Sequence, residues 1–233
     1  ECSKPWVDAT LPRLLEALRS RVVAMSDDEV KNLDRDQVLR CVFEPVIRLL
    51  ERCRVSRGEI EDLRDELVLL LCHRRLKSQF LERRLKALSD VKEMVDRAAR
   101  NGTGSGLARW LADDGHAIML ILCARPHPEV LRRANFLLRF LASERLLTLE
   151  NISTLWACGC AADKHDDLTS CVLDLFVEIA AALNREQATF IMERVTTQND
   201  VRFLRFLRDF LLASHRTGEC PEDGLALFWR WIQ

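Results

Sequence analysis

Residues 56–71 read SRGEIEDLRDELVLLL, and this stretch carries the pattern that decides the fold class. Ser56 and Glu59, three residues apart, form a capping box, which is a sequence signature of a helix N-terminus. Apolar residues follow at intervals of three and four, the spacing of one helix face. They are Ile60, Leu63, Leu67, Leu70 and Leu71. The stretch therefore predicts a long amphipathic helix.

Helix-start signals of the same kind recur along the rest of the chain. Further capping boxes pair Ser26 with Glu29, Asp34 with Gln37 and Asn184 with Gln187. Single N-cap candidates precede apolar stripes at Ser78, Thr148 and Asn199. Helical signals thus continue from one end of the sequence to the other.

Proline and glycine are scarce. The chain has 6 prolines and 8 glycines in 233 residues, and few breakers favour long helices over short strands and tight turns. Pro12, Pro128 and Pro221 fit the first turn of a helix. Pro45 instead lies inside an apolar stripe over 38–50, and this position predicts a kink or a break.

Several expected helices carry apolar residues on more than one face. The helix at 199–216 has Phe203 and Phe210 on one side and Phe206 on another, and 116–124 is apolar nearly all round. Helices with two buried faces pack on both a predecessor and a successor, as in stacked helical layers. We therefore predict an all-α fold, an irregular armadillo- or HEAT-like superhelix of about twelve stacked helices.

One glycine-rich stretch interrupts the series. Residues 101–106 read NGTGSG, a composition typical of a flexible connection. We expect a single helical-repeat domain over 1–233, with a flexible joint near 101–106 between a front set of helices (1–100) and a back set (107–233).

Composition and charge bound the kinds of partner. The formal net charge is -1, and charges of both signs are intermixed, so bulk electrostatics do not favour nucleic acid or an acidic membrane. No apolar run approaches the roughly 18 residues that a membrane span needs. We therefore expect other proteins as partners, without nucleic acid or membrane. Because the chain begins with Glu1, we also expect it to be a piece of a longer protein.

The nine cysteines are scattered, and most lie in apolar helical context. Reduced cysteine behaves there as a small buried hydrophobe. An odd number in a chain of this length does not suggest the disulfide framework of a small secreted domain. A reducing compartment, the cytoplasm, fits this pattern.

The sharpest candidate for a metal site is Cys158-Gly159-Cys160 with His165 and Cys171 nearby. Thiolate and imidazole groups suit zinc, but C-x-C alone is a weak pattern and no second pair completes it. A helix end at Gly159 with structural cysteines is the better interpretation, and we expect no metal and no cofactor.

A Cys/His enzyme is the alternative from a different functional class. No cysteine lies in a glycine-rich or helix N-terminal context that would lower its pKa, and the phosphate-binding, dinucleotide-binding and zinc-peptidase motifs are absent. We therefore expect that this chain is not catalytic.

A basic run spans the end of one expected helix and the start of the next. It consists of Arg74, Arg75, Lys77, Arg83, Arg84 and Lys86. The run could contact phosphate or an acidic partner. It lacks interleaved aromatic residues, and Glu82 and Asp90 dilute its charge, so a solvated helix face is the preferred interpretation.

Trp156 is the clearest candidate for a core anchor in the back set. It follows Ile152 and Leu155 on one apolar stripe, so we expect it to be buried. Arg83, by contrast, is expected at the surface.

Three stretches resemble the helical non-catalytic region of the large fat-facets-type ubiquitin-specific peptidases. They are FLERRLKALSDV at 80–91, HPEVLRR at 127–133 leading to Phe140-Leu141, and LTLENISTLW at 147–156 followed by Lys164-His165-Asp166. Their order along the chain is that of the family. Ala87 stands where the family commonly has Gly, and Asp166 where Glu is usual.

The resemblance covers about residues 78–185, and its motifs are packing motifs. The family's catalytic boxes, a Gly-Asn-Thr-Cys loop and a Gly-His-Tyr segment, are absent, and the chain has no tyrosine. The resemblance implies a non-catalytic scaffold within a deubiquitinase polypeptide, which presents surface for substrate or partner recruitment. An unrelated HEAT- or armadillo-type adaptor is the alternative binding module.

Overall fold

A computed structural model of the chain describes residues 4–32, 43–101, 107, 110, 122–160, 165–198 and 200–214. Every regular element within these residues is helical, and none of them forms a strand. The all-α prediction is therefore confirmed. Among the same residues, no helix is both long and apolar enough to cross a membrane.

The chain divides into two compact units, Glu1–Arg109 and Trp110–Gln233. We call them unit 1 and unit 2. The division falls just beyond the glycine-rich stretch, whose residues 102–106 lie outside the described part of the chain. Further predictions that fall outside it are the box of Asp34 and Gln37, most of the apolar helix at 116–124, the cap at Asn199 and the helix that begins at Pro221.

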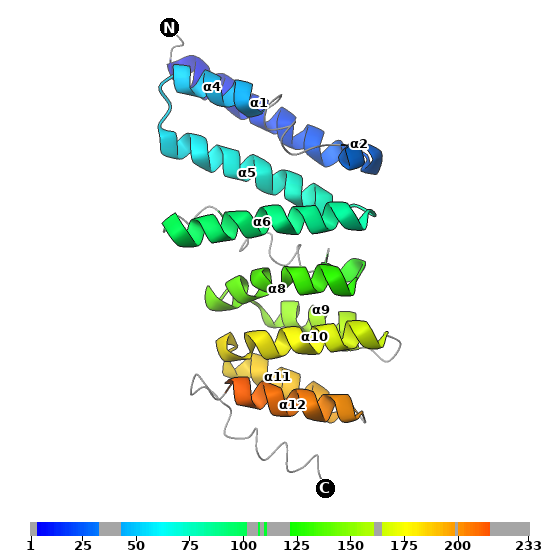
Figure 1. Cartoon of the computed structure of the whole chain (residues 1–233). Helices are drawn as coiled ribbons and strands as arrows, with labels where there is room; N and C mark the ends of the chain where they lie inside the picture. The colour runs from blue at the N-terminus through cyan, green and yellow to red at the C-terminus, as the bar shows by residue number, and fades with distance from the viewer. Residues whose placement is uncertain are drawn as a thin grey trace. The chain divides into compact units, whose positions relative to one another are not determined.

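Unit 1 is built around α5. Its described helices are α1 (Lys4–Ala24), α2 (Asp27–Asn32), α4 (Glu44–Arg52), α5 (Arg57–Leu76) and α6 (Leu81–Asn101). Helix α5 runs beside α6 and also packs on α1 and α4 (Figure 1). One core cluster joins Phe43 and Leu50 at α4 to Ile60, Leu63 and Leu67 of α5. Burial on several sides of α5 follows from its apolar sequence.

Capping boxes form at the starts of two helices of unit 1, α2 and α5. At α5 the Ser56 side chain accepts from the backbone N–H of Glu59, and the Glu59 carboxylate accepts from the N–H of Ser56, at 3.3 and 3.1 Å. Ser26 and Glu29 form the same reciprocal pair at α2, at 3.2 and 2.8 Å. Both boxes are confirmed. Pro45 lies in the first turn of α4, so the expected break is the start of a helix. The prediction that Pro12 lies in a first turn is wrong, because α1 begins earlier, at Lys4, and Pro12 lies inside it.

The carboxyl group of Glu29 is predicted to titrate at an unusually low pH. The Ser26 backbone N–H first, and then Arg21, lower its pKa from 4.5 to about 2. Because the folded pKa lies below the unfolded value, the stabilisation is complete above about pH 4.5 and is lost as the pH falls towards 2. NMR titration of this carboxyl checks the value. Arg21→Ala should leave the midpoint below 4.5, since the backbone contact remains, and a parent midpoint near 4.5 would contradict the capping geometry.

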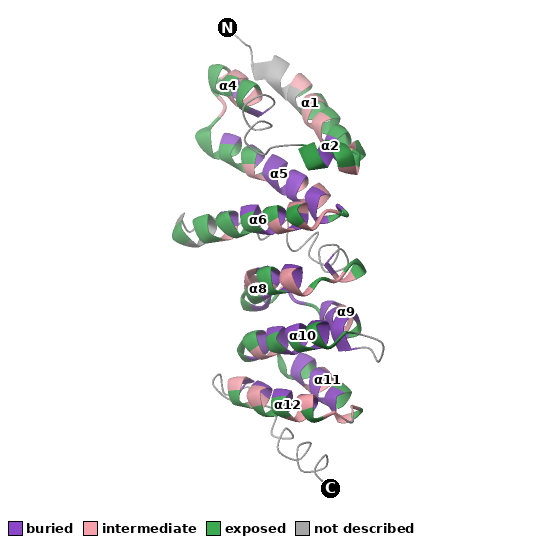
Figure 2. Cartoon of the chain, turned by 45° about the vertical axis from the view of Figure 1, so that its right-hand side comes forward, coloured by how far each residue is buried: buried purple, intermediate pink, exposed green. Residues whose placement is uncertain are grey.

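Unit 2 is built around α10. Its described elements are α8 (Pro128–Ser143), α9 (Leu149–Cys160), α10 (Asp166–Ile179), the 3₁₀ turn η2 (Ala180–Ala182), α11 (Arg185–Thr196) and α12 (Val201–Ser214). Helix α10 packs against α8, α9 and α12, and α11 packs on α9 and α12. Buried positions therefore cover much of α9 and α10, as Figure 2 shows.

Three predicted helix starts in unit 2 are confirmed. Pro128 is the first residue of α8, and Thr148 precedes α9 with its hydroxyl accepting from the N–H of Asn151 at 3.2 Å. Asn184 and Gln187 form the expected capping box. At α12 the cap is Asp200, whose carboxylate accepts from the N–H of Arg202 at 2.8 Å. Asn199, the cap predicted from the sequence, lies outside the described residues.

Candidate interaction surface

The four residues of the predicted zinc candidate do not converge. Cys158, Cys160 and Cys171 are buried in the core of unit 2, whereas the side chain of His165 is 80% exposed. His165 caps α10, because its Nδ1 accepts the backbone N–H of Asp167 at 3.3 Å. Nowhere in the described part of the chain do three or more His, Cys, Asp or Glu side chains form a group able to hold a metal ion.

The close approach of α10 explains why a glycine, Gly159, lies between the two cysteines. It lies inside α9, which ends one residue later at Cys160. A Cβ atom built at Gly159 would lie 2.4 Å from Cγ2 and 2.7 Å from Cβ of Val172. The Thr169 hydroxyl of α10 donates to the Gly159 carbonyl at 2.7 Å. The C-G-C sequence thus marks the close approach of two helices.

Gly159→Ala is predicted to destabilise unit 2 by about 1–3 kcal/mol, because the added methyl group overpacks the α9–α10 contact. The sign is informative, since Gly→Ala inside an unobstructed helix stabilises by roughly 0.5–1 kcal/mol. Gly58→Ala in α5 is the matched control, because nothing lies within 4 Å of a Cβ built there. Chemical denaturation should move the two midpoints in opposite directions. A stabilised Gly159→Ala variant would contradict the close approach.

Three thiols of unit 2 have a pKa above the usual value for cysteine: Cys123, Cys160 and Cys171. Burial raises the pKa of Cys160 to about 12 and that of Cys171 to about 11. The contact with Cys158, together with burial, raises the pKa of Cys123 far above its usual range. A cysteine nucleophile needs a lowered pKa, so these three thiols are in the wrong environment for catalysis.

Cys160 and Cys171 are therefore predicted to resist alkylation in the folded chain. At pH 8 a thiol with a pKa of about 11 is only roughly one-thousandth thiolate. Iodoacetamide labelling followed by peptide mass mapping should leave both residues unmodified, and the same chain in guanidinium chloride should be labelled at both. Rapid labelling of either residue in the folded chain would contradict the burial described above.

The basic run does not form one solvated face. Arg75 and Arg84 are buried, with exposed fractions of 1% and 5%, and the solvated-face interpretation is wrong for these two residues. Arg75 donates to the buried carboxylate of Asp90 at 3.1 Å. Packing of α5 on α6 brings Arg75 against Asp90, and the burial of both arginines is not what their charge alone predicts.

The other members of the run are divided between structural contacts and solvent. Arg74 is half-buried and donates to the Met25 carbonyl and the Asp27 carboxylate, at 2.6 and 2.9 Å. Lys77 and Lys86 are exposed, and Arg83 is half-buried. The run is therefore not a continuous patch, and a partner contact by its exposed members stays a prediction.

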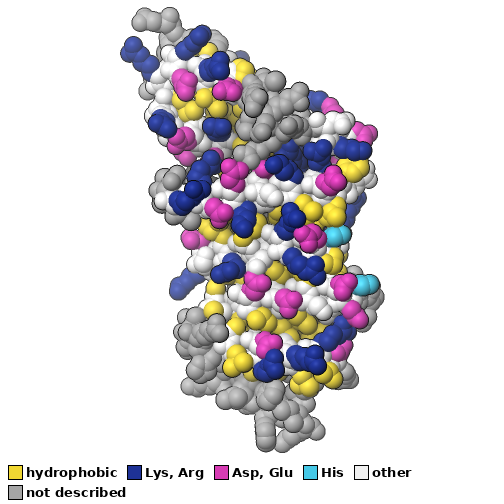
Figure 3. Space-filling model, in the orientation of Figure 1, with side chains coloured by type: hydrophobic (Ala, Val, Ile, Leu, Met, Phe, Trp, Pro, Cys, Tyr) yellow, Lys and Arg dark blue, Asp and Glu magenta, His cyan; other side chains and the backbone are white. Residues whose placement is uncertain are grey.

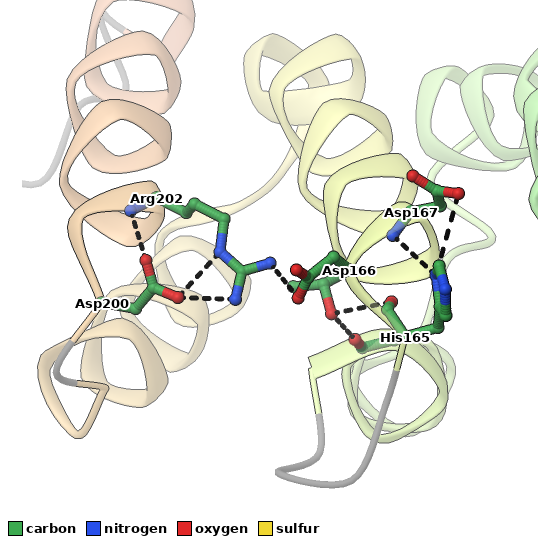
Figure 4. Close-up of polar contacts among 7 residues, drawn as sticks. His165, Asp166, Asp167, Asp200 and Arg202 are labelled. Atoms are coloured by element: carbon green, nitrogen blue, oxygen red, sulfur yellow. Dashed lines mark hydrogen bonds and ion pairs between the residues drawn. The ribbon is translucent and has the colours of Figure 1, made fainter.

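A polar cluster joins the starts of α10 and α12 (Figure 4). Arg202 donates to Asp166 of α10 at 2.6 Å and to Asp200 at 2.7 Å. The hydrogen bonds from Arg202 lower the pKa of Asp200. The bonds to Asp200 first, and then to Asp166, raise the pKa of Arg202. His165 caps the same end of α10. We call His165, Asp166, Asp200 and Arg202 the α10–α12 clamp, and its described contacts are structural.

Among the described residues of unit 2, the most exposed large apolar side chains lie on α12. Val201 and Leu212 are each 64% exposed, whereas Phe203, Phe206 and Phe210 of the same helix are buried. Arg205 and Arg208 are exposed between the two apolar residues. Positions 201, 205, 208 and 212 follow helical spacing and share one face. We call them the α12 strip. The sequence identifies the phenylalanines of α12 but not this outer face.

Comparison with known proteins relates this all-helical chain to a region of ubiquitin carboxyl-terminal hydrolases. The chain is 25% identical over 134 residues to the probable ubiquitin carboxyl-terminal hydrolase FAF of Drosophila melanogaster, covering 54% of this chain. It is 20% identical over 198 residues to the ubiquitin carboxyl-terminal hydrolase 9Y of Mus musculus, covering 77% of this chain. It spans only 5% and 8% of the length of these two relatives. No family model matches, and neither does any solved structure.

Proposed function

We propose that this chain is a non-catalytic helical scaffold within a large fat-facets-type ubiquitin-specific peptidase. It acts in the cytoplasm and presents surface for the recruitment of substrates or partner proteins. Its helices stack in an irregular armadillo- or HEAT-like arrangement. The similarity to two ubiquitin carboxyl-terminal hydrolases, one of them over 77% of the chain, is the observation that carries the proposal.

The positions of the motif residues support this role. Trp156 of the stretch LTLENISTLW is a core residue, His165 caps α10, and Asp166 belongs to the α10–α12 clamp. A resemblance carried by such residues concerns the helical framework and not a reaction centre.

The environments of Cys160 and Cys171 argue against the alternative of a Cys/His enzyme. Burial raises the pKa of Cys160 and of Cys171, and His165, at the surface, uses its Nδ1 atom to cap a helix. An adaptor unrelated to the peptidases would have the same framework, and the reading frame that contains this chain decides between them. A peptidase domain in the same polypeptide supports the proposal, and its absence supports the adaptor.

A ubiquitin-based activity probe tests the absence of catalysis. The isolated chain should form no covalent adduct with ubiquitin carrying a C-terminal electrophile, whereas a known cysteine deubiquitinase in the same assay should. An adduct that disappears on a single Cys→Ser change would contradict the proposal and identify the nucleophile.

Deletion of this region from the peptidase that contains it tests recruitment. Cleavage of ubiquitin bearing a small fluorescent reporter should be unchanged, because the reaction centre lies elsewhere. Removal of ubiquitin from protein substrates that depend on recruitment should slow. If the deletion variant and the parent cleave each kind of substrate at the same rate, a recruiting role is contradicted. The reporter reaction controls for misfolding of the peptidase domain.

A further inference from the structure

The outward direction of the α12 strip is fixed by the core beneath it. Phe203 packs on Trp156, with ring centroids 6.0 Å apart, and Phe206 packs on Phe210 at 5.4 Å. These buried rings set the rotation of α12 about its axis, so Val201, Arg205, Arg208 and Leu212 face away from the core. Figure 3 shows Lys and Arg side chains over the middle of α12, with hydrophobic side chains towards both ends.

The strip has a definite length and charge pattern. Leu212 lies eleven positions after Val201, which is about 16 Å along a helix, or three turns. Two positive charges lie between the two apolar side chains, one turn apart. Arg208 contacts its neighbour Asp209 at 2.8 Å, and both arginine side chains remain exposed. The strip thus offers two apolar contacts that flank a basic centre.

We propose that the α12 strip binds an amphipathic helix of a partner protein. This helix carries two apolar side chains about three turns apart and acidic side chains between them. An amphipathic helix that lays its apolar face on a second helix is a recurring mode of recognition, and carboxylates placed opposite Arg205 and Arg208 supply charge complementarity. The inference deepens the scaffold role proposed above and rests on it, since it assigns the surface and the class of partner.

Charge disfavours a second copy of this chain as the occupant. Antiparallel pairing of two strips would place Val201 against Leu212, but it would also place Arg205 of one copy against Arg208 of the other. Like charges in register repel one another and select against the pairing. A membrane is disfavoured because interfacial helices bury a large apolar face, and this strip offers only two aliphatic side chains.

A synthetic peptide helix tests the proposal with the 233-residue chain. The peptide has two leucines eleven residues apart, glutamates four and seven residues after the first leucine, and alanine and glutamine elsewhere. Calorimetry should detect binding to the parent chain. Joint reversal by Arg205→Glu and Arg208→Glu should weaken it at least about tenfold, as expected for loss of two charge pairs. A second peptide with lysines in place of the glutamates should bind the reversed variant and not the parent.

Matched controls separate the strip from net charge. Arg13→Glu with Arg139→Glu reverses two other exposed arginines and should leave the affinity for the glutamate peptide unchanged. The proposal is overturned if the parent chain binds neither peptide. This holds also if the reason is that another part of the chain, or a second copy of it, occupies the strip. It is also overturned if the control variant weakens binding equally. A third outcome would assign the strip to membranes instead. In it, the parent binds no peptide but binds vesicles of phosphatidylcholine and phosphatidylserine, and the charge reversal abolishes this vesicle binding.

The same reversal in the intact peptidase distinguishes this inference from the scaffold role. The α12 inference predicts slower cleavage of recruited protein substrates with unchanged cleavage of the small reporter. If deletion of the whole region slows substrate cleavage but the charge reversal does not, the scaffold role stands and the inference about the α12 strip is wrong. If neither change has an effect, the scaffold role itself fails.

Discussion

Replacing Asp90 with alanine is expected to lower the free energy of unfolding of unit 1 by about 3–5 kcal/mol, the range for breaking a buried ion pair from one side. Asp90 is 3% exposed and Arg75 is 1% exposed, with 3.1 Å between the bonded oxygen and nitrogen. Lys86 approaches the other carboxylate oxygen at 3.7 Å. Without the carboxylate, the guanidinium of Arg75 keeps its charge in a site shielded from water.

Urea denaturation followed by far-UV circular dichroism measures the effect. Asp96→Ala on the exposed side of α6 is the control and should change stability by less than about 0.5 kcal/mol. Joint replacement, Arg75→Leu with Asp90→Leu, should recover at least half of the loss, because the two opposite charges of the pair are then removed together. An Asp90→Ala variant with the parent midpoint would show that the pair is accessible to solvent.

Replacing Trp156 with alanine is expected to cost unit 2 about 3–5 kcal/mol, the usual range for a large aromatic side chain removed from a core. Trp156 is 6% exposed and lies between two aromatic rings, at centroid distances of 6.1 Å to Phe176 and 6.0 Å to Phe203. The indole therefore joins α9 to both α10 and α12. Its removal takes away contacts on both sides and leaves a cavity that these neighbours fill only in part.

The midpoint of denaturant unfolding gives the size of this effect, and Arg83→Ala is the comparison, with an expected change below about 0.5 kcal/mol. Trp156→Phe should retain much of the stability, since an aromatic ring still packs between the two phenylalanines. A Trp156→Ala variant that unfolds with the parent would place the indole at the surface. Trp156 would then become a candidate partner contact.

Local chemistry is the part of this structure that the sequence predicts well. The boxes at Ser56 and at Asn184 involve residues three apart, and a proline at the start of α8 needs only its own ring geometry. The burial of Trp156 follows from its place on one apolar stripe with Ile152 and Leu155. Each of these predictions depends on neighbours within one or two turns.

Features that depend on a second helix were predicted less well. The sequence predicts that Arg75 and Arg84 are surface charges. In the structure both are buried, and Asp90 of α6 lies against Arg75 of α5. Gly159 lies at the predicted helix end, but the close approach of Val172 of α10 to it could not be predicted from α9 alone. From the sequence, His165 is only part of a weak metal candidate, and its role as the cap of α10 is not predicted. The outer face of α12 likewise becomes visible only when its phenylalanines are fixed in the core.

Sliding of α10 along α9 would have to lift Val172 away from Gly159 and break the hydrogen bond from Thr169 to the Gly159 carbonyl. At its N-terminal end α10 is also held to α12 through Asp166 and Arg202. Shear between packed helices is one of the common ways in which helical proteins change shape. The contacts of α10 with α9 and with α12 oppose shear on two sides of α10. The three helices should therefore move as one rigid body on the microsecond-to-millisecond timescale of such motions.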